Sequence, residues 1–343
     1  MNTMATVSEK PDKQIKNYRE DVRALWFGIL FSFIFTGVIW LTGGYLRDLE
    51  STFLPDQGVD WYYWKMPEPT LLGGILAWGF FLVHLGIIWY LIYYAQTKQR
   101  KYSTNLQKFN IIALITNAVF SFLHLFRTHT TYDGLAMSYA PQISQAAVVI
   151  MLVMILIMEN RRRGMFFGKP APTITSEVVR AMRKYHGYFF ALFIIQAFHF
   201  NPMTSATAGH MMGFLYTFLL MLQGSLFYNN IHRDKYWTTF MEAAVLIHGS
   251  IVAINQDGIS GFWPMFFFGF AGIFVVTQMH GLGLSVKSRW IIMGVYSSLV
   301  MVVGFSFRGL EVLRDLIAIP IIDYSLIFVI SWFTWLIMRV ISR

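Results

Sequence analysis

Residues 24–45 read ALWFGILFSFIFTGVIWLTGGY, a run of 22 residues without a charged side chain. As a helix rising about 1.5 Å per residue, the run is about 33 Å long, which is enough to cross the roughly 30 Å hydrocarbon core of a bilayer. The polar segment before it carries five Lys or Arg side chains. Because the run is too long for a signal-peptide core and lacks a small-residue cleavage site, it is predicted to be a retained first membrane span.

The composition of the whole chain agrees with that prediction. The 343 residues are 56% hydrophobic and 13% charged, with a mean hydropathy of +0.50, whereas soluble domains carry about 25% charged residues. These values exclude a disordered chain, a coiled coil and an ordinary soluble enzyme. The fold class expected is therefore all-α, a polytopic integral membrane protein.

Apolar runs of spanning length recur along the chain. We expect about ten transmembrane helices, at residues 24–45, 70–95, 109–127, 142–158, 184–200, 208–228, 237–255, 262–282, 289–307 and 320–341. The remaining residues divide into a cytoplasmic N-terminal tail, 1–23, and loops within a single transmembrane domain, 24–343. One of the outer loops contains an aromatic cluster at residues 61–64, which is typical of a membrane interface.

The basic residues predict the orientation of this domain. If the N-terminus is cytoplasmic, 22 of the 27 Lys and Arg residues fall in the N-terminal tail, the inner loops and the C-terminal end. That asymmetry is what the positive-inside rule requires, so both termini are expected in the cytoplasm and the protein in a plasma or inner membrane. The net charge of +9 then reports topology rather than a nucleic-acid partner. Three arginines at 161–163 are suited to anionic lipid headgroups.

Several kinds of chemistry are excluded by what the sequence lacks. There is no cysteine, hence no disulfide, thiolate nucleophile or Cys-ligated cluster. There is also no phosphate-binding glycine loop, no dinucleotide fingerprint, and no HExxH or HxxxH spacing.

Histidines supply the first candidate site. Five of the nine are expected in the outer half of the membrane, and imidazole suits copper, iron and zinc. The hypothesis is a transition-metal or haem site with His124, His199, His210 and His248 as ligands and Asp133 or Asp257 as supporting carboxylates. The alternative is that these histidines are neutral and hydrogen-bond across helices.

A second candidate site is expected toward the cytoplasm. Glu242 is taken as the only carboxylate inside a span, and with His280 and His186 it would form a proton relay. The alternative is a glutamate that is hydrogen-bonded to a glutamine or that extends its carboxylate toward the cytoplasmic surface.

Three functions follow from these two sites. The first is a membrane enzyme, metal- or haem-dependent, that acts on a small or lipid-soluble substrate. The second is a proton-coupled secondary transporter, although no two-fold repeat supports it. The third is a structural or assembly protein of the bilayer. The sequence decides neither whether the chain is an enzyme nor its oligomeric state.

Overall fold

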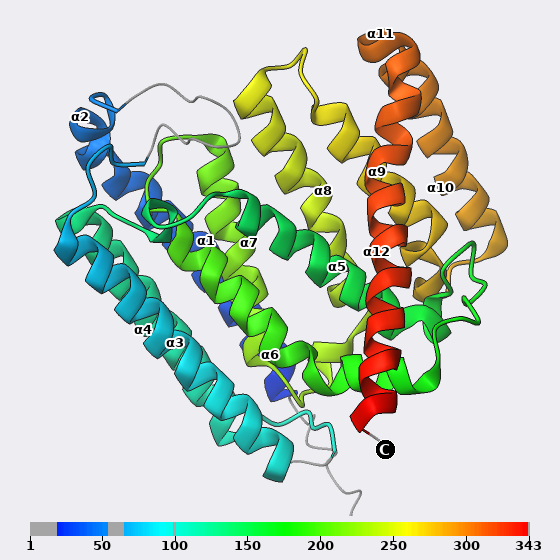
Figure 1. Ribbon diagram of the computed structural model, residues 1–343, viewed down its shortest axis with the longest axis horizontal. Helices are drawn as coiled ribbons and strands as arrows, with labels where there is room; N and C mark the ends of the chain where they lie inside the picture. Colours follow the sequence, from blue (N-terminus) through cyan, green and yellow to red (C-terminus); the bar gives the residue numbers. More distant parts are fainter. Residues whose placement is uncertain (1–18, 54–64, 99–100, 342–343) are drawn as a thin grey trace, which may run out of the picture.

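The computed structural model describes residues 19–53, 65–98 and 101–341, and within these ranges every extended regular element is a helix (Figure 1). In these ranges ten helices have 14 residues or more: α1 (Glu20–Gly43), α3 (Leu71–Lys98), α4 (Lys108–Thr131), α5 (Gln142–Arg163), α6 (Ser176–Phe200), α7 (Ala208–Ser225), α8 (Lys235–Asp257), α9 (Trp263–Val276), α10 (Val286–Leu299) and α12 (Val312–Ile341). The all-α prediction is confirmed for this part of the chain. The predicted tail up to residue 18 and the aromatic cluster at 61–64 lie outside the described residues.

Short elements complete the chain between these helices. They are η1 (Gly44–Leu46), α2 (Arg47–Glu50), η2 (Leu135–Met137), η3 (Ile231–Arg233), η4 (Gln278–Leu282), the π-helical turn η5 (Val300–Gly304), α11 (Phe305–Arg308) and η6 (Gly309–Glu311). The chain reverses direction at α11, between α10 and α12 (Figure 1).

Six segments of the described chain are long and apolar enough to cross a membrane. They are Glu20–Glu50, Leu71–Lys98, Lys108–Thr131, Gln142–Arg163, Lys235–Asp257 and Val286–Ile341. The last of these contains the reversal at α11. Each of the ten predicted spans falls on a helix, but α6 and α7 do not meet the same criterion and α9 is a shorter apolar helix.

Side-chain caps fix where several helices begin. Thr175 accepts from the backbone N–H of Val178 at the start of α6 (3.4 Å), and the carboxylate of Asp234 accepts two backbone N–H groups at the start of α8 (3.0 Å each). Such caps satisfy N–H groups that have no partner inside the helix. Gly164 ends α5 with φ +74°, a conformation that favours glycine.

The exterior of the molecule is apolar, which is the reverse of a soluble protein. Large aromatic side chains on α1 are among the exposed ones, with Trp26 at 65% and Trp40 at 61% exposure. A soluble monomer rarely exposes contiguous apolar surface of this kind. This exterior and the six apolar segments together indicate that the protein is embedded in a membrane.

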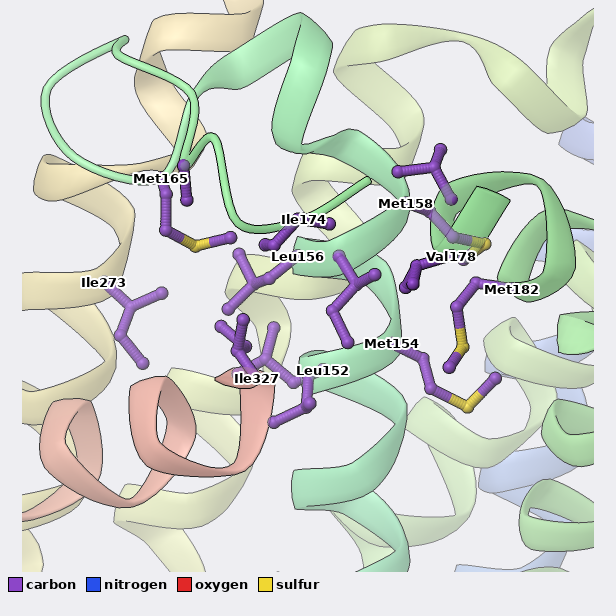
Figure 2. Close-up of a cluster of buried hydrophobic side chains, with 14 of the residues drawn as sticks. Leu152, Met154, Leu156, Met158, Met165, Ile174, Val178, Met182, Ile273 and Ile327 are labelled. Atoms are coloured by element: carbon purple, nitrogen blue, oxygen red, sulfur yellow. The ribbon is translucent and has the colours of Figure 1, made fainter. Parts of the chain in front are cut away.

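The largest apolar core lies where α5, α6, α9 and α12 meet, together with the loop after α5 (Figure 2). Leu152 and Leu156 of α5 pack in it with Ile273 of α9 and Ile327 of α12. Met154, Met158, Met165 and Met182 fill the same core. Flexible thioethers such as these are good fillers of irregular gaps.

Candidate functional site

A cavity of about 1030 Å³ lies between α5, α6, α7 and α8. Its volume is at the upper end of the range typical of ligand pockets, about 300–1,000 Å³. Apolar side chains form much of its wall, among them Ile88, Ile92, Val148, Met151, Leu152, Ile155, Phe190, Ile194, Leu220, Met221 and Val245. An elongated apolar molecule would therefore find continuous van der Waals contact inside it.

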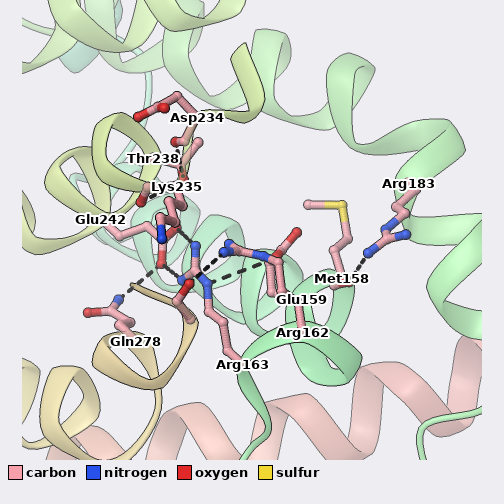
Figure 3. A network of polar contacts seen from close by, with 11 residues as sticks. Met158, Glu159, Arg162, Arg163, Arg183, Asp234, Lys235, Thr238, Glu242 and Gln278 are labelled. Atoms are coloured by element: carbon pink, nitrogen blue, oxygen red, sulfur yellow. Dashed lines mark hydrogen bonds and ion pairs between the residues drawn. The ribbon is translucent and has the colours of Figure 1, made fainter. Parts of the chain in front are cut away.

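Charged side chains gather at another part of the same wall. The lining contains six cationic residues and three carboxylates, Arg19, Arg162, Arg163, Arg183, Arg233 and Lys235 with Glu159, Asp234 and Glu242. Most of them come from the end of α5, the start of α6 and the start of α8, and Figure 3 shows these three segments together. The excess of cations gives this part of the wall a positive potential.

The strongest polar contact in this region is the pair formed by Arg163 and Glu242. Nη2 of Arg163 donates to Oε1 of Glu242 at 2.6 Å, and Nη1 donates to Oε2. Gln278 adds a hydrogen bond to Oε2 at 3.2 Å. Both charged side chains are nearly inaccessible, at 1% and 3% exposure, so the pair joins α5 to α8 away from water.

Three of the lining cations have neutral partners. Arg183 donates to the carbonyl of Met158 (2.9 Å) and Nζ of Lys235 to that of Leu282 (2.6 Å). The guanidinium of Arg233 lies 3.7 Å from the centre of the Tyr102 ring. No ion pair within the described chain neutralises any of these three charges, which leaves them available to an anionic group.

Two histidines lie on the cavity wall close to these cations. The ring centres of His186 and His232 are 6.3 Å apart. Nδ1 of His186 contacts the carbonyl of Arg183 (2.9 Å), and Nδ1 of His232 contacts that of Gln223 (2.8 Å). Because a carbonyl only accepts, Nδ1 carries the proton in both rings and Nε2 is the acceptor when the ring is neutral. Burial lowers the pKa of His232 to about 4.

Asn117, also on the cavity wall, begins a chain of hydrogen bonds through histidines. Its amide nitrogen donates to Oγ of Ser225 (2.8 Å), so its oxygen accepts from Nε2 of His84 (2.7 Å). Nδ1 of His84 must then accept from Nε2 of His199 (3.3 Å). The chain fixes the tautomers of both rings, and Nδ1 of His199 is left as a buried acceptor with no partner among the described residues.

Next to this chain lies a buried arginine. Arg127 is fully inaccessible, and its Nη2 donates to Nε2 of His124 at 2.7 Å. The ring of His124 stacks on that of His199, with centres 5.2 Å apart. Arg127 is the last residue of the predicted span 109–127, and in the structure it lies within α4 with its guanidinium covered on every side.

The four proposed metal ligands do not all meet. His124 and His199 are in contact, but Nδ1 of His210 contacts Oγ1 of Thr207 (3.1 Å), and the ring of His248 lies beside Tyr216, 5.9 Å between centres. Within the described residues no group of three or more His, Asp or Glu side chains is arranged to hold a metal ion. The metal hypothesis therefore loses its structural support.

The two proposed supporting carboxylates lie in different surroundings. Asp133 is buried and its Oδ2 accepts from the N–H and the hydroxyl of Thr70 (3.2 and 3.0 Å). Burial raises the pKa of Asp133, and these hydrogen bonds oppose the rise. Asp257 is exposed at the end of α8. Neither contacts one of the proposed metal ligands in the hydrogen bonds described.

The three members of the proposed proton relay each have other partners. Glu242 pairs with Arg163, His186 contacts the backbone of Arg183, and Nδ1 of His280 accepts from Arg289 (3.2 Å). The sequence identified Glu242 as an interior carboxylate, which is confirmed. It is not the only one: Asp323 lies within the predicted span 320–341 and is 1% exposed.

Sequence reasoning also missed the cavity and the role of His84. The central position of His84 in its span was a usable signal, because a polar side chain at that depth needs a partner. The cavity gave no such signal. Its apolar wall is assembled from several helices, and the periodicity of a sequence does not distinguish apolar residues that line a cavity from those packed in a core.

No family model, curated protein or solved structure matches this chain.

Proposed function

We propose that the protein binds an amphipathic anion in the cavity between α5, α6, α7 and α8. The apolar chain of the ligand lies along the apolar wall, and its acidic group lies among Arg183, Arg233 and Lys235. The observation that carries the proposal is the joining of both surfaces in one cavity. A purely apolar ligand would leave the three cations without a counterion, and a small ion would leave the apolar wall without contacts.

We further propose ten spans with both ends on the cytoplasmic side of a plasma or inner membrane. In that orientation the loops 159–183 and 229–236, which contribute most of the lining cations, face the cytoplasm. The acidic group is then held near the inner surface while the chain extends toward the middle of the bilayer. This arrangement suits a lipid or lipid-like substrate that enters from the membrane.

The direct test is binding of dodecyl phosphate to the purified protein, followed by native mass spectrometry or calorimetry, with dodecanol as the uncharged control. Arg183→Gln should weaken binding of dodecyl phosphate roughly tenfold or more, because a charge-assisted hydrogen bond is worth about 1.5–3 kcal/mol. The matched control is Arg161→Gln, since Arg161 is a nearby exposed cation that does not line the cavity.

A substitution that fills the cavity provides a second test of the same proposal. Leu220→Trp adds bulk to the apolar wall and should weaken binding of both dodecyl phosphate and dodecanol. Equal binding of dodecyl phosphate by the wild type and both cavity variants would overturn the proposal. So would an equal loss in Arg183→Gln and Arg161→Gln, because that result describes attraction to surface charge alone.

A further inference from the structure

Asp323 is a buried acid that has no part in the cavity. It lies on the covered face of α12, whose buried residues are Val312, Asp315, Ile319, Asp323, Ile327 and Ser331. Its side chain is 1% exposed, and neither carboxyl oxygen has a hydrogen-bond partner in the described structure. Buried polar groups are usually paired, so an acid with two unpartnered oxygens requires a physical explanation.

The surroundings of Asp323 are apolar. Ile319 and Ile327, one turn before and one turn after it, both belong to the core with Leu156 of α5 and Ile273 of α9 (Figure 2). An ionised carboxylate in such a place carries a large desolvation cost that no partner in the described structure offsets. The neutral acid avoids most of that cost, so the packed arrangement favours a proton on Asp323.

No cation on the helices that pack against α12 offsets a negative charge here. α9 contains no ionisable residue between Trp263 and Val276. The charged residues of α5 are confined to 159–163, where Arg163 pairs with Glu242. On α6 the charges lie at 177–184. Its titratable rings are Tyr185, His186, Tyr188 and His199; Tyr185 is exposed, and the other three contact groups other than Asp323.

The remaining titratable neighbours on α12 are also occupied. The hydroxyl of Tyr324 bonds to Thr277 (2.9 Å) and to the carbonyl of Met165 (3.2 Å). Asp315, two turns before Asp323 on the same face, pairs with Arg308 at 2.9 Å. Asp315 therefore has a cationic partner, whereas Asp323 has none in the described structure.

We propose that Asp323 is an intramembrane proton-binding site whose occupancy is coupled to the packing of α12 against α5 and α9. In the packed state the side chain is the neutral acid. When α12 separates from this core, water reaches the carboxyl group, its O–H bond breaks, and the proton passes to water and leaves a carboxylate. Pro320 lies one turn earlier and gives no N–H to the carbonyl of Leu316, which makes this part of α12 the place where it can bend.

Infrared difference spectroscopy tests the proton directly. The wild type minus Asp323→Asn spectrum at neutral pH should contain the C=O stretch of a protonated carboxylic acid, shifted in D2O. Asp315→Asn, which removes a paired carboxylate, should not remove this band. Absence of a protonated-acid band from the wild type minus Asp323→Asn spectrum would overturn the proposal.

Thermal unfolding in detergent gives an independent measurement. The folded state keeps the proton, whereas an unfolded Asp releases it near its ordinary pKa of about 3.9. Above that pH the folded state binds more protons than the unfolded state, so the contribution of Asp323 to stability decreases as the pH rises. The Tm of Asp323→Asn should therefore rise relative to wild type from roughly pH 5 to pH 8. A difference in Tm that stays constant over this range contradicts the proposal.

The coupling to α12 is tested with a single engineered thiol, which is possible because the chain has no cysteine. Ser331→Cys places the thiol on the buried face, two turns after Asp323 (the serine is 5% exposed). As the pH rises, the rate of maleimide labelling should increase more in the Ser331→Cys protein than in Ser331→Cys/Asp323→Asn. The double variant is the control for ionisation of the thiol itself. Equal acceleration in both proteins would show that proton release does not open this interface.

Discussion

The guanidinium of Arg163, the last residue of α5, contacts both carboxylate oxygens of Glu242 on α8. The two residues are 79 positions apart, and the pair forms part of the cavity wall. It therefore couples the stability of the bundle to the shape of the proposed binding site. A carboxylate that sequence reasoning assigned to proton transfer has, in the structure, the position of an ion-pair partner.

Breaking this pair from the arginine side should be costly. Arg163→Met leaves Glu242 buried with only Gln278 as partner, and we expect a loss of about 3–5 kcal/mol in the free energy of unfolding. Glu242→Gln should cost less, because Glu159 remains 3.9 Å from Nε of Arg163. Denaturant titration in detergent measures both values.

Two further variants control this prediction. The double variant Arg163→Met/Glu242→Gln should recover part of the loss, since it leaves no buried charge unpaired. Arg162→Gln removes a pair with Glu159 that is partly exposed and should cost about 0–1 kcal/mol. An additive double variant would mean that the pair contributes nothing of its own.

Asn117 should matter more than its neighbour Ser121 on the same helix. Asn117→Ala removes the acceptor of His84 and the donor to Ser225, for a cost of about 1–3 kcal/mol. Ser121 is fully buried whereas Asn117 is only half-buried, but the hydroxyl of Ser121 bonds only to the carbonyl of Asn117 within α4 (2.8 Å). The Tm of Asn117→Ala should therefore be well below that of Ser121→Ala. Similar Tm values would contradict the hydrogen-bond chain.

Two glycines of α1 should respond oppositely to alanine. A Cβ on Gly43 would lie 2.2 Å from Oγ and 2.8 Å from the backbone N of Ser205, so Gly43→Ala forces the 205 region away from α1. A Cβ on Gly37 has no other atom within 4 Å. Gly37→Ala should stabilise by up to about 1 kcal/mol through helix propensity. Comparable losses in both variants would exclude close packing at Gly43 as the cause.

His232 should make the protein less stable in acid. Burial lowers its folded-state pKa to about 4, whereas the ordinary value is about 6.5. Between these two pH values the unfolded chain binds the proton and the folded chain does not, so stability is full above the upper value and falls toward the lower one. His232→Asn should flatten the decline in Tm over this range, and an unchanged slope would assign the acid sensitivity to other groups.

The sequence by itself determined the class of this protein. Uncharged runs such as residues 24–45 leave helices as the only practical way to satisfy the backbone inside a bilayer, and this is a local requirement that needs no tertiary information. The interior position of Glu242 was predicted for the same reason, because a carboxylate inside an apolar run is visible in that segment alone. Asp323 carried the same local signal and was overlooked.

Only the tertiary structure decided which polar groups meet. His84 contacts His199 from 115 residues away, and Arg163 rather than a histidine takes the carboxylate of Glu242. The rotation of each helix and its choice of neighbour come from the packing of similar apolar faces, for which many sequence registers look alike. The cavity and the isolation of Asp323 are consequences of that packing. The sequence was therefore sufficient to identify a membrane protein, whereas the positions of its candidate sites depend on how the helices assemble.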